Sequence, residues 1–250
     1  MVSRKSSNYF PGMHHNNRTT GSQIIENYFR QLDEKLIGSL KKKSKLKSPP
    51  CICLSRKIAI GAREVADILA ERLNYMVIDR QIIEHMASNA ELSQKTVEKF
   101  DERYPGKMNE LMNFLFGENS FIPSDYSRQL TQSVLALSGL HPSIFVGRGT
   151  HLILPRDRTF SVRLTGSIET RVKRLGKIIN KDEEACRIEL ARQDSEQASF
   201  FKKVYGKKDA RSTEFDMVIN RDYLEKPEIV ADIIEFAFYK KFGKEIPGGK

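Results

Sequence analysis

The sequence of 250 residues contains no run of apolar residues that approaches the roughly 20 needed to span a bilayer. It also begins without the continuous apolar core of a signal peptide. Cysteine is scarce: the three cysteines are Cys51, Cys53 and Cys186, and no neighbouring histidine completes a metal site around the first two. We therefore expect no metal site built by the protein alone. An odd number of cysteines without a secretion signal favours a reducing, cytoplasmic location.

Positive charge is concentrated at one end of the chain. The formal net charge is +10, of which residues 1–48 contribute +7 and the remainder +3. The body is therefore close to neutral, and the sequence pI of about 9.4 is poor support for a nucleic-acid-binding domain. No aromatic residues are interleaved with the lysines of residues 41–47. We do not expect a nucleic-acid partner, and a weak contact of this segment with nucleic acid or anionic lipid is the third of three functional hypotheses.

Residues 1–48 form an extension that precedes the main domain. Residues 1–19 are polar and turn-rich, and we expect them to be disordered. Apolar residues recur at helical spacing over residues 22–40, which predicts an amphipathic helix that docks on the body or joins two copies as a homodimer. Pro49-Pro50 forces an extended boundary, so the main domain spans residues 49–250.

Residues 53–80 predict the unit around which the main domain is organised. Their pattern is a short buried strand, a loop around Gly61, an amphipathic helix, and a second strand that ends at Asp79-Arg80. A loop that opens a helix in this way directs backbone N–H groups and the positive end of the helix dipole toward one point. Phosphate is the usual ligand of such a point.

Further short apolar strands alternate with helices along the rest of the chain. Strands are predicted at residues 143–146, 159–164 and 216–219. Helices are predicted at residues 81–90, 93–100, 108–116, 125–137, 182–205 and 227–241, with one more that begins at Ser167. Ser93 and Ser167 are expected N-caps, and Gly139 is expected to end one helix. The alternation predicts an α/β fold with a parallel sheet covered by helices on both faces.

Ligands of parallel sheets gather beyond the carboxyl ends of the strands, and four signals fall there. They are residues 55–64, then Asp79-Arg80, then Gly147-Arg148-Gly149, and then the helix that carries Arg171 and Arg174. Arginine suits phosphate because its planar fork matches two oxygens, and glycines let the backbone approach a ligand. An arginine pair at helical spacing is more often a solvated face, but four signals at strand ends together predict one anion pocket.

These residues resemble the cytidylate kinase-like family, relatives of bacterial cytidylate kinase among the nucleoside monophosphate kinases. The resemblance covers about residues 52–238 and rests, in family order, on LSRKIAIGAREVADILAERL, YMVIDRQIIEHMA, VEKFDE, IFVGRGTHLIL, VRLTGSIETRVKRL and FDMVIN. It implies a three-layer P-loop kinase-like fold with a five-stranded parallel sheet and a mobile helical lid around residues 174–201. It also implies ATP with Mg²⁺ as the phosphate donor. Residues 49–250 would be the nucleotide-binding domain, and residues 1–48 lie outside the resemblance.

The resemblance also implies roles for individual residues, which fall into four groups. The phosphate loop would consist of Ser55, Arg56, Lys57, Gly61, Ala62, Arg63 and Glu64. The acceptor nucleotide would be held by Asp79, Arg80, Gly147, Arg148 and Gly149. The lid would carry Arg171, Arg174 and Gln197. The catalytic residues would be Arg63, Arg148, Arg174 and Asp194.

The chain departs from the usual phosphate loop at several positions. A P-loop uses glycines to wrap its amides around phosphate and a lysine to follow the transferred charge. Here Ala62 stands at the lysine position and Glu64 at the serine or threonine position, although this family generally lacks the lysine and carries Arg63 and Glu64 instead. Ala59 and Ala62 replace family glycines, and their methyl groups disfavour positive φ. Gln197 stands where the lid usually carries an arginine, and losing such an arginine can cost roughly 10³-fold or more in rate.

The other two of the three functional hypotheses concern the domain that resembles the family. The first is a nucleoside monophosphate kinase-like phosphotransferase that moves the ATP γ-phosphate to a CMP-like acceptor. The second is a catalytically degenerate relative that binds a nucleotide or serves as a regulatory or scaffold module, as the changes at Ala62 and Gln197 suggest.

Overall fold

The computed structural model describes residues 49–116 and 124–243 of the chain. The helix predicted at residues 22–40, with its predicted docking or dimer contact, and the segment predicted to be disordered at residues 1–19 lie outside the described residues. No helix within the described ranges is both long enough and apolar enough to cross a membrane. The three cysteines are free and buried.

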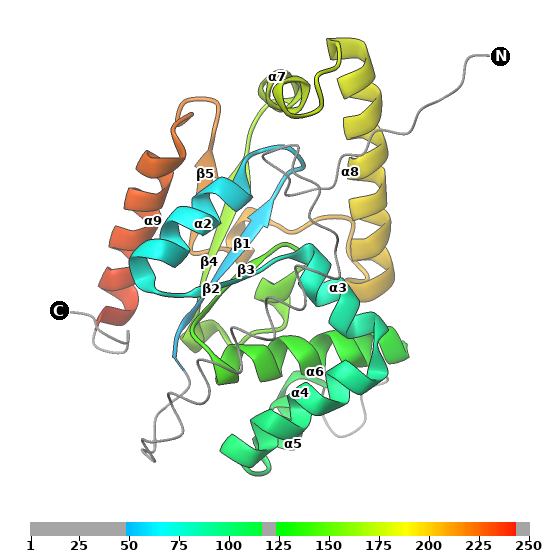
Figure 1. The fold of residues 1–250 in the computed structure, drawn as a ribbon, viewed down its shortest axis with the longest axis vertical. Coiled ribbons are helices and arrows are strands. Elements are labelled where there is room, and N and C mark those ends of the chain that lie inside the picture. Colours follow the sequence, from blue (N-terminus) through cyan, green and yellow to red (C-terminus); the bar gives the residue numbers. More distant parts are fainter. Residues whose placement is uncertain (1–48, 117–123, 244–250) are drawn as a thin grey trace.

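Five parallel strands form the sheet in the order β2-β3-β1-β4-β5, which confirms the predicted α/β class (Figure 1). The strands are β1 (Cys51–Arg56), β2 (Met76–Ile78), β3 (Ser143–Val146), β4 (Thr159–Thr165) and β5 (Met217–Asn220). β1 is central, pairs with β3 and β4, and is buried along its whole length. Its first four residues are apolar because a strand covered on both faces meets no water.

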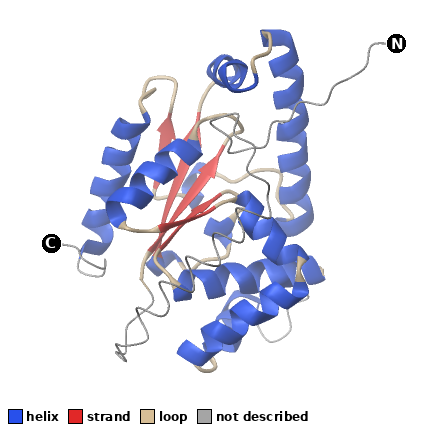
Figure 2. Ribbon diagram, in the orientation of Figure 1, coloured by secondary structure: helices blue, strands red, loops and turns tan. Residues whose placement is uncertain are grey.

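Helices cover both faces of the sheet and make three layers (Figure 2). On one face pack α2 (Ala62–Leu73) and α9 (Pro227–Phe242). On the other pack α3 (Arg80–Ser88), α4 (Ala90–Arg103), α5 (Lys107–Phe116) and α6 (Asp125–Leu140). Alternate residues of β1 serve the two faces: Ile52 and Leu54 belong to the first core, and Cys51 and Cys53 to the second. Cys51 and Cys53 therefore lie on one face of β1.

A third apolar cluster joins the β1–α2 loop, the predicted phosphate loop, to a pair of helices beyond the carboxyl edge of the sheet. These helices are α7 (Ile168–Ile179) and α8 (Glu183–Tyr205), drawn at the top and side of Figure 1. Ile58 and Ala59 of the loop pack there against Leu175 of α7 and Leu190 of α8. The far end of α8 packs instead on the core that contains Cys53. Short 3₁₀ turns lie at η1 (Thr150–Leu152), η2 (Arg156–Arg158) and η3 (Ser212–Glu214).

Two predicted helix boundaries are wrong, and packing explains both. α4 begins before Ser93, with Asn89 as its N-cap, and Ser93 is buried with its hydroxyl 3.0 Å from that of Ser133 on α6. α6 continues past Gly139 instead of ending there. A Cβ at Gly139 would lie 2.3 Å from the ring of Phe100, so this glycine lets α4 and α6 approach closely.

Candidate functional site

The loop between β1 and α2 forms the first part of the site. It ends at Gly61, whose φ of 79° lies in the left-handed region that glycine adopts without strain. Gly61 is the N-cap of α2 and has no side chain to accept from the first turn, so the N–H groups there keep their capacity for a ligand. Ala59 also has a positive φ, 61°, which costs a residue with a Cβ roughly 1 kcal/mol. The loop therefore adopts left-handed backbone conformations at both Ala59 and Gly61, although only one of the two is a glycine.

Arg174 of α7 closes over this loop. Its Nη2 donates to both carboxylate oxygens of Glu64, at 2.7 Å each. A Cβ added to Gly61 would lie 2.2 Å from the same nitrogen, so the guanidinium rests directly on the Gly61 backbone. Gly61, Glu64 and Arg174, which the sequence assigned to the phosphate loop and the lid, thus lie side by side.

Arg171 braces the loop from the same helix. Its Nε donates to the carbonyl of Ile58 at 2.8 Å, and its Nη2 donates to both oxygens of Asp194 on α8 at 2.7 and 2.8 Å. The side chain is almost completely buried. Arg171 and Asp194 therefore hold α7, α8 and the phosphate loop together.

Arg63 joins the phosphate loop to the second predicted segment. Its Nε donates to Asp67 at 2.8 Å, and its Nη1 donates to Asp79 at 2.5 Å. The other oxygen of Asp79 accepts from the N–H groups of Gln81 and Ile82 and caps α3. The Asp79 carboxylate is therefore held between the start of α2 and the start of α3.

Lys57 points away from these groups. Its Nζ donates to Asp209 at 2.9 Å, and Arg163 of β4 binds the same carboxylate at 2.8 Å. Within the predicted phosphate loop, Lys57 thus lies toward β4, on the opposite side from Asp79.

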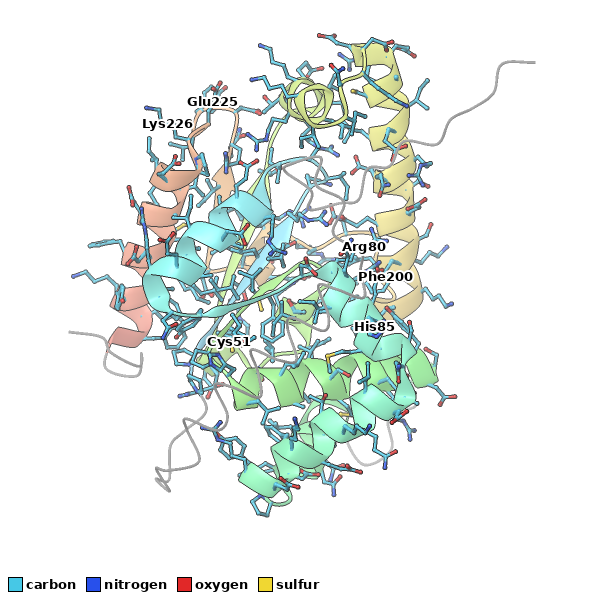
Figure 3. All side chains as sticks on the ribbon, in the orientation of Figure 1. Cys51, Arg80, His85, Phe200, Glu225 and Lys226 are labelled. Atoms are coloured by element: carbon cyan, nitrogen blue, oxygen red, sulfur yellow. The ribbon has the colours of Figure 1, made fainter. Side chains whose placement is uncertain are left out.

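A cleft opens beside the loop, where β1, β3 and α3 approach α8. Its lining residues are Ser55, Arg56, Arg80, Gly147, Arg148, Gly149, Glu196, Gln197, Phe200 and Phe201. The predicted acceptor residues Arg80 and Arg148 therefore share one cleft with Arg56 of the phosphate loop and Gln197 of the lid. Arg80 on α3 and Phe200 on α8 lie close to one another in the side-chain view (Figure 3). Gln197 donates to the carbonyl of Arg56 at 3.3 Å.

Arg148 has an unusual backbone conformation. Gly147, Arg148 and Gly149 all have positive φ, of 86°, 53° and 68°. The hydroxyl of Tyr205 donates to the Arg148 carbonyl at 2.5 Å, and a Cβ on Gly149 would lie 2.5 Å from the Tyr205 ring. The guanidinium of Arg148 lies 3.9 Å from the centre of the Phe200 ring, within cation–π range. The glycines thus permit a turn that carries the Arg148 side chain into the cleft.

Positive charge accumulates in this cleft. Burial first, and then the charges of Arg80 and Arg56, lower the pKa of Arg148 to about 9. Burial also lowers the pKa of Arg80. Two carboxylates offset part of this repulsion. Glu84 accepts from Arg80 Nε at 3.0 Å and forms an ion pair with Arg148, and the charge of Glu196 raises the pKa of both arginines. An anionic ligand would offset the repulsion further.

Glu84, Phe200 and Tyr205 belong to this site and were missed in the sequence. Glu84 follows Arg80 by four residues on a helix, and that spacing could have identified it as a partner. The two aromatic residues lie late in α8 and carried no such signal. Their contact with Arg148 depends on where α8 crosses the end of β3, which is a property of the fold.

Comparisons with known proteins agree with this architecture. A sequence profile described as the cytidylate kinase-like family matches residues 51–223. A solved structure of an uncharacterized protein from Eubacterium ventriosum ATCC 27560 is similar at 20% identity and a TM-score of 0.58, over 78% of this chain and 99% of that one. Shikimate kinase from Bacteroides thetaiotaomicron is similar at 15% identity and a TM-score of 0.40, over 76% and 98% of the two chains. None of the curated proteins compared with this chain matches it.

Proposed function

The chain belongs to the cytidylate kinase-like family, and from this premise we propose that it transfers the γ-phosphoryl group of ATP to a CMP-like nucleoside monophosphate. The observation that carries the proposal is the cleft in which Arg56 and Arg148 converge with Arg80, the first residue of α3. Phosphoryl transfer depends mainly on positioning two phosphates and neutralising their charge. A cleft with three arginines next to a helix N-terminus suits that task.

The acceptor phosphate would bind Arg148 and Arg80. Each guanidinium can donate two parallel hydrogen bonds to phosphate, and burial of the Arg148 side chain, which is 8% exposed, strengthens its bonds because it excludes water. Glu84 holds the two arginines on one carboxylate and so keeps them at a common position. Asp79, fixed by Arg63 and the start of α3, would orient the acceptor through a hydroxyl or amine.

The donor phosphates would bind the first-turn N–H groups of α2, with Arg63 and Arg174 beside them. ATP with Mg²⁺ supplies the phosphoryl group and neutralises part of its charge when bound. The described ranges contain no cluster of three or more His, Cys, Asp or Glu side chains that could hold a metal. Mg²⁺ bound to a nucleotide needs only one or two carboxylates besides phosphate oxygens and water, and Glu64 or Asp79 would supply them on exchanging an arginine partner for the ion.

A turnover assay tests the proposal. With ATP, Mg²⁺ and a panel of nucleoside monophosphates, we expect the wild-type protein to release ADP with a cytidine-like acceptor. Arg148→Ala should lower kcat/KM on the order of 10²–10³-fold, because a buried phosphate contact is lost. Arg72→Ala is the matched control: Arg72 makes its ion pairs with Asp232 and Glu235, between α2 and α9, and should leave turnover unchanged.

A degenerate nucleotide-binding relative is the second candidate. The Arg174–Glu64 ion pair lies over Gly61, and Gln197 stands in the cleft where an arginine is usual, so charge at the reaction centre is reduced. ATP-dependent thermal stabilisation without ADP release from any acceptor would favour this candidate over the kinase. Equal ADP release by wild type and Arg148→Ala would remove the acceptor-site assignment instead.

A further inference from the structure

Arg221, the residue directly after β5, is a buried cation that the proposed mechanism does not use. Its side chain is 1% exposed and is among the largest fully buried side chains of the described ranges. Its Nη2 donates to the carbonyl of Glu225, in the loop labelled in Figure 3. Its Nε and Nη1 have no hydrogen-bond partner among the described residues.

A buried guanidinium with two unused N–H groups is costly. A buried donor without a partner loses its hydrogen bond to water on folding, and the loss is greater when the donor is charged. Such a group is retained where a ligand or ion completes its hydrogen bonds. A negatively charged ligand could therefore accept from the two buried N–H groups of Arg221.

The position of Arg221 places that acceptor near the phosphate loop. The backbone N–H of Arg221 donates to the carbonyl of Thr165, at the end of β4, at 2.8 Å. This bond continues the β4–β5 register. At the neighbouring Gly166, an added Cβ would lie 2.6 Å from Ile60 of the phosphate loop and 3.0 Å from Asp222. The ends of β4 and β5 therefore pack directly against the loop that precedes α2.

The Arg221 guanidinium also shares its electrostatic environment with Arg174 and Glu64. Burial lowers the pKa of Arg221, Arg174 lowers it further, and the charge of Glu64 acts in the opposite direction. Glu225 and Glu228 also favour the charged form, but neither carboxylate accepts a hydrogen bond from Arg221 among the described contacts. Arg174 has an unused buried Nε as well. Arg174 binds the Glu64 carboxylate, and both groups lie within electrostatic range of Arg221.

We propose that Arg221, together with Arg174, binds the polyphosphate of the donor nucleotide and supplies the positive charge that the phosphate loop lacks at Ala62. This inference rests on the proposed function, because it assigns the donor side of the same site. In this proposal, phosphate oxygens accept hydrogen bonds from Nε and Nη1 of Arg221. Arg174 exchanges its ion pair with Glu64 for a bond to the same phosphates. Arg221 is a binding residue that approaches from β5 rather than from the loop itself.

Calorimetric titration of the full chain with ATP and with inorganic tripolyphosphate tests this inference. Arg221→Gln should weaken both ligands by about 10- to 100-fold, since a hydrogen bond to a charged group contributes about 1.5–3 kcal/mol. Arg221→Lys should recover part of the loss, and Arg72→Gln should bind like wild type. A folded Arg221→Gln protein that binds tripolyphosphate as tightly as wild type would overturn the inference.

A second measurement applies even where Arg221→Gln does not fold. In ¹⁵N spectra of the wild-type protein, the Arg221 Nε–H resonance, identified by its loss in Arg221→Lys, should shift on addition of tripolyphosphate. An unshifted resonance at saturation overturns the inference, as does a wild-type protein that binds neither ligand. A different result would contradict the proposed kinase function but not the role of Arg221. In that case tripolyphosphate would bind in a manner that depends on Arg221, and no acceptor would lead to ADP release.

Discussion

His151 is a buried histidine whose charge state differs between the folded and unfolded chain. Its side chain is 4% exposed, and its ring centre lies 4.5 Å from that of Phe215. Its Nε2 lies 3.5 Å from Glu214, whose negative charge favours protonation. Burial outweighs this attraction and lowers the pKa of His151 to about 4. The folded protein therefore holds His151 neutral at physiological pH.

Acidification should destabilise the fold through His151. Because the folded pKa lies below the unfolded value of about 6.5, the unfolded chain binds more protons as pH falls toward 4. We expect the free energy of unfolding to fall by about 2 kcal/mol between pH 7 and pH 5 from this residue. Urea denaturation at the two pH values should show the loss in wild type and a much smaller one in His151→Phe. A control, His141→Gln, should keep the wild-type pH dependence, and an equal slope in all three proteins would refute the assignment.

At the scale of single residues, the sequence predicted the cations of the site better than their partners. Arg148 was recognisable because glycines flank it at the end of a strand. Glu84 was not selected because an acidic residue on a helix usually faces water. Its position behind two arginines is visible only once α3 and β3 are adjacent. The functional roles of the predicted site residues remain predictions.

The loop that precedes α2 is an element under local strain. Ala59 adopts a φ of 61° and is buried against α7 and α8. Ala59→Gly should relieve roughly 1–2 kcal/mol of backbone strain and lose a similar amount through unfolded-state entropy and the buried methyl group. We therefore expect its free energy of unfolding, measured in urea, to stay within about 0.5 kcal/mol of wild type.

Ala66→Gly is the matched comparison, because Ala66 lies inside α2 with ordinary helical geometry. It should lower the free energy of unfolding by roughly 1–2 kcal/mol, through helix propensity and a lost buried methyl group. If both glycine variants lost the same stability, positive φ at residue 59 would carry no strain.

At the scale of elements, local signals predicted helices well and their boundaries less well. Ser167 was expected to begin a helix, and it caps α7 by accepting from the N–H of Thr170 at 3.2 Å. Ser93 and Gly139 carry equally strong local signals, yet both lie inside helices at the contact of α4 with α6. Their roles are set by tertiary packing, which short-range patterns do not contain.

Binding of ATP should raise the Tm of the whole molecule. Ligand binding to the folded state at about 100 times Kd adds about 2.7 kcal/mol of stability. For a chain of this size that corresponds to a rise in Tm of roughly 5–10 °C. Differential scanning fluorimetry with Mg-ATP should show this rise in wild type and a smaller one in Arg174→Gln, and no rise in wild type would contradict a donor site at Gly61.

At the same scale, the parallel sheet was predictable and the strand order was not. Alternating strands and helices without tight hairpin turns require parallel crossovers, so the layer architecture followed from the pattern. The order β2-β3-β1-β4-β5 depends on which strands become neighbours, and no local residue signal records that choice. The resemblance to the family implied the five-stranded sheet that the structure contains.

The 23 residues of α8 extend about 34 Å as one uninterrupted rod. Near its beginning, Leu190 rests on the loop proposed for ATP; near its end, Gln197 and Phe200 line the proposed pocket for the acceptor. A small change in the orientation of α8 at one end therefore displaces the residues at its other end. Under the proposed function, a nucleotide that shifted α8 at one end would alter the site at the other, and the two affinities would then change each other by the same factor.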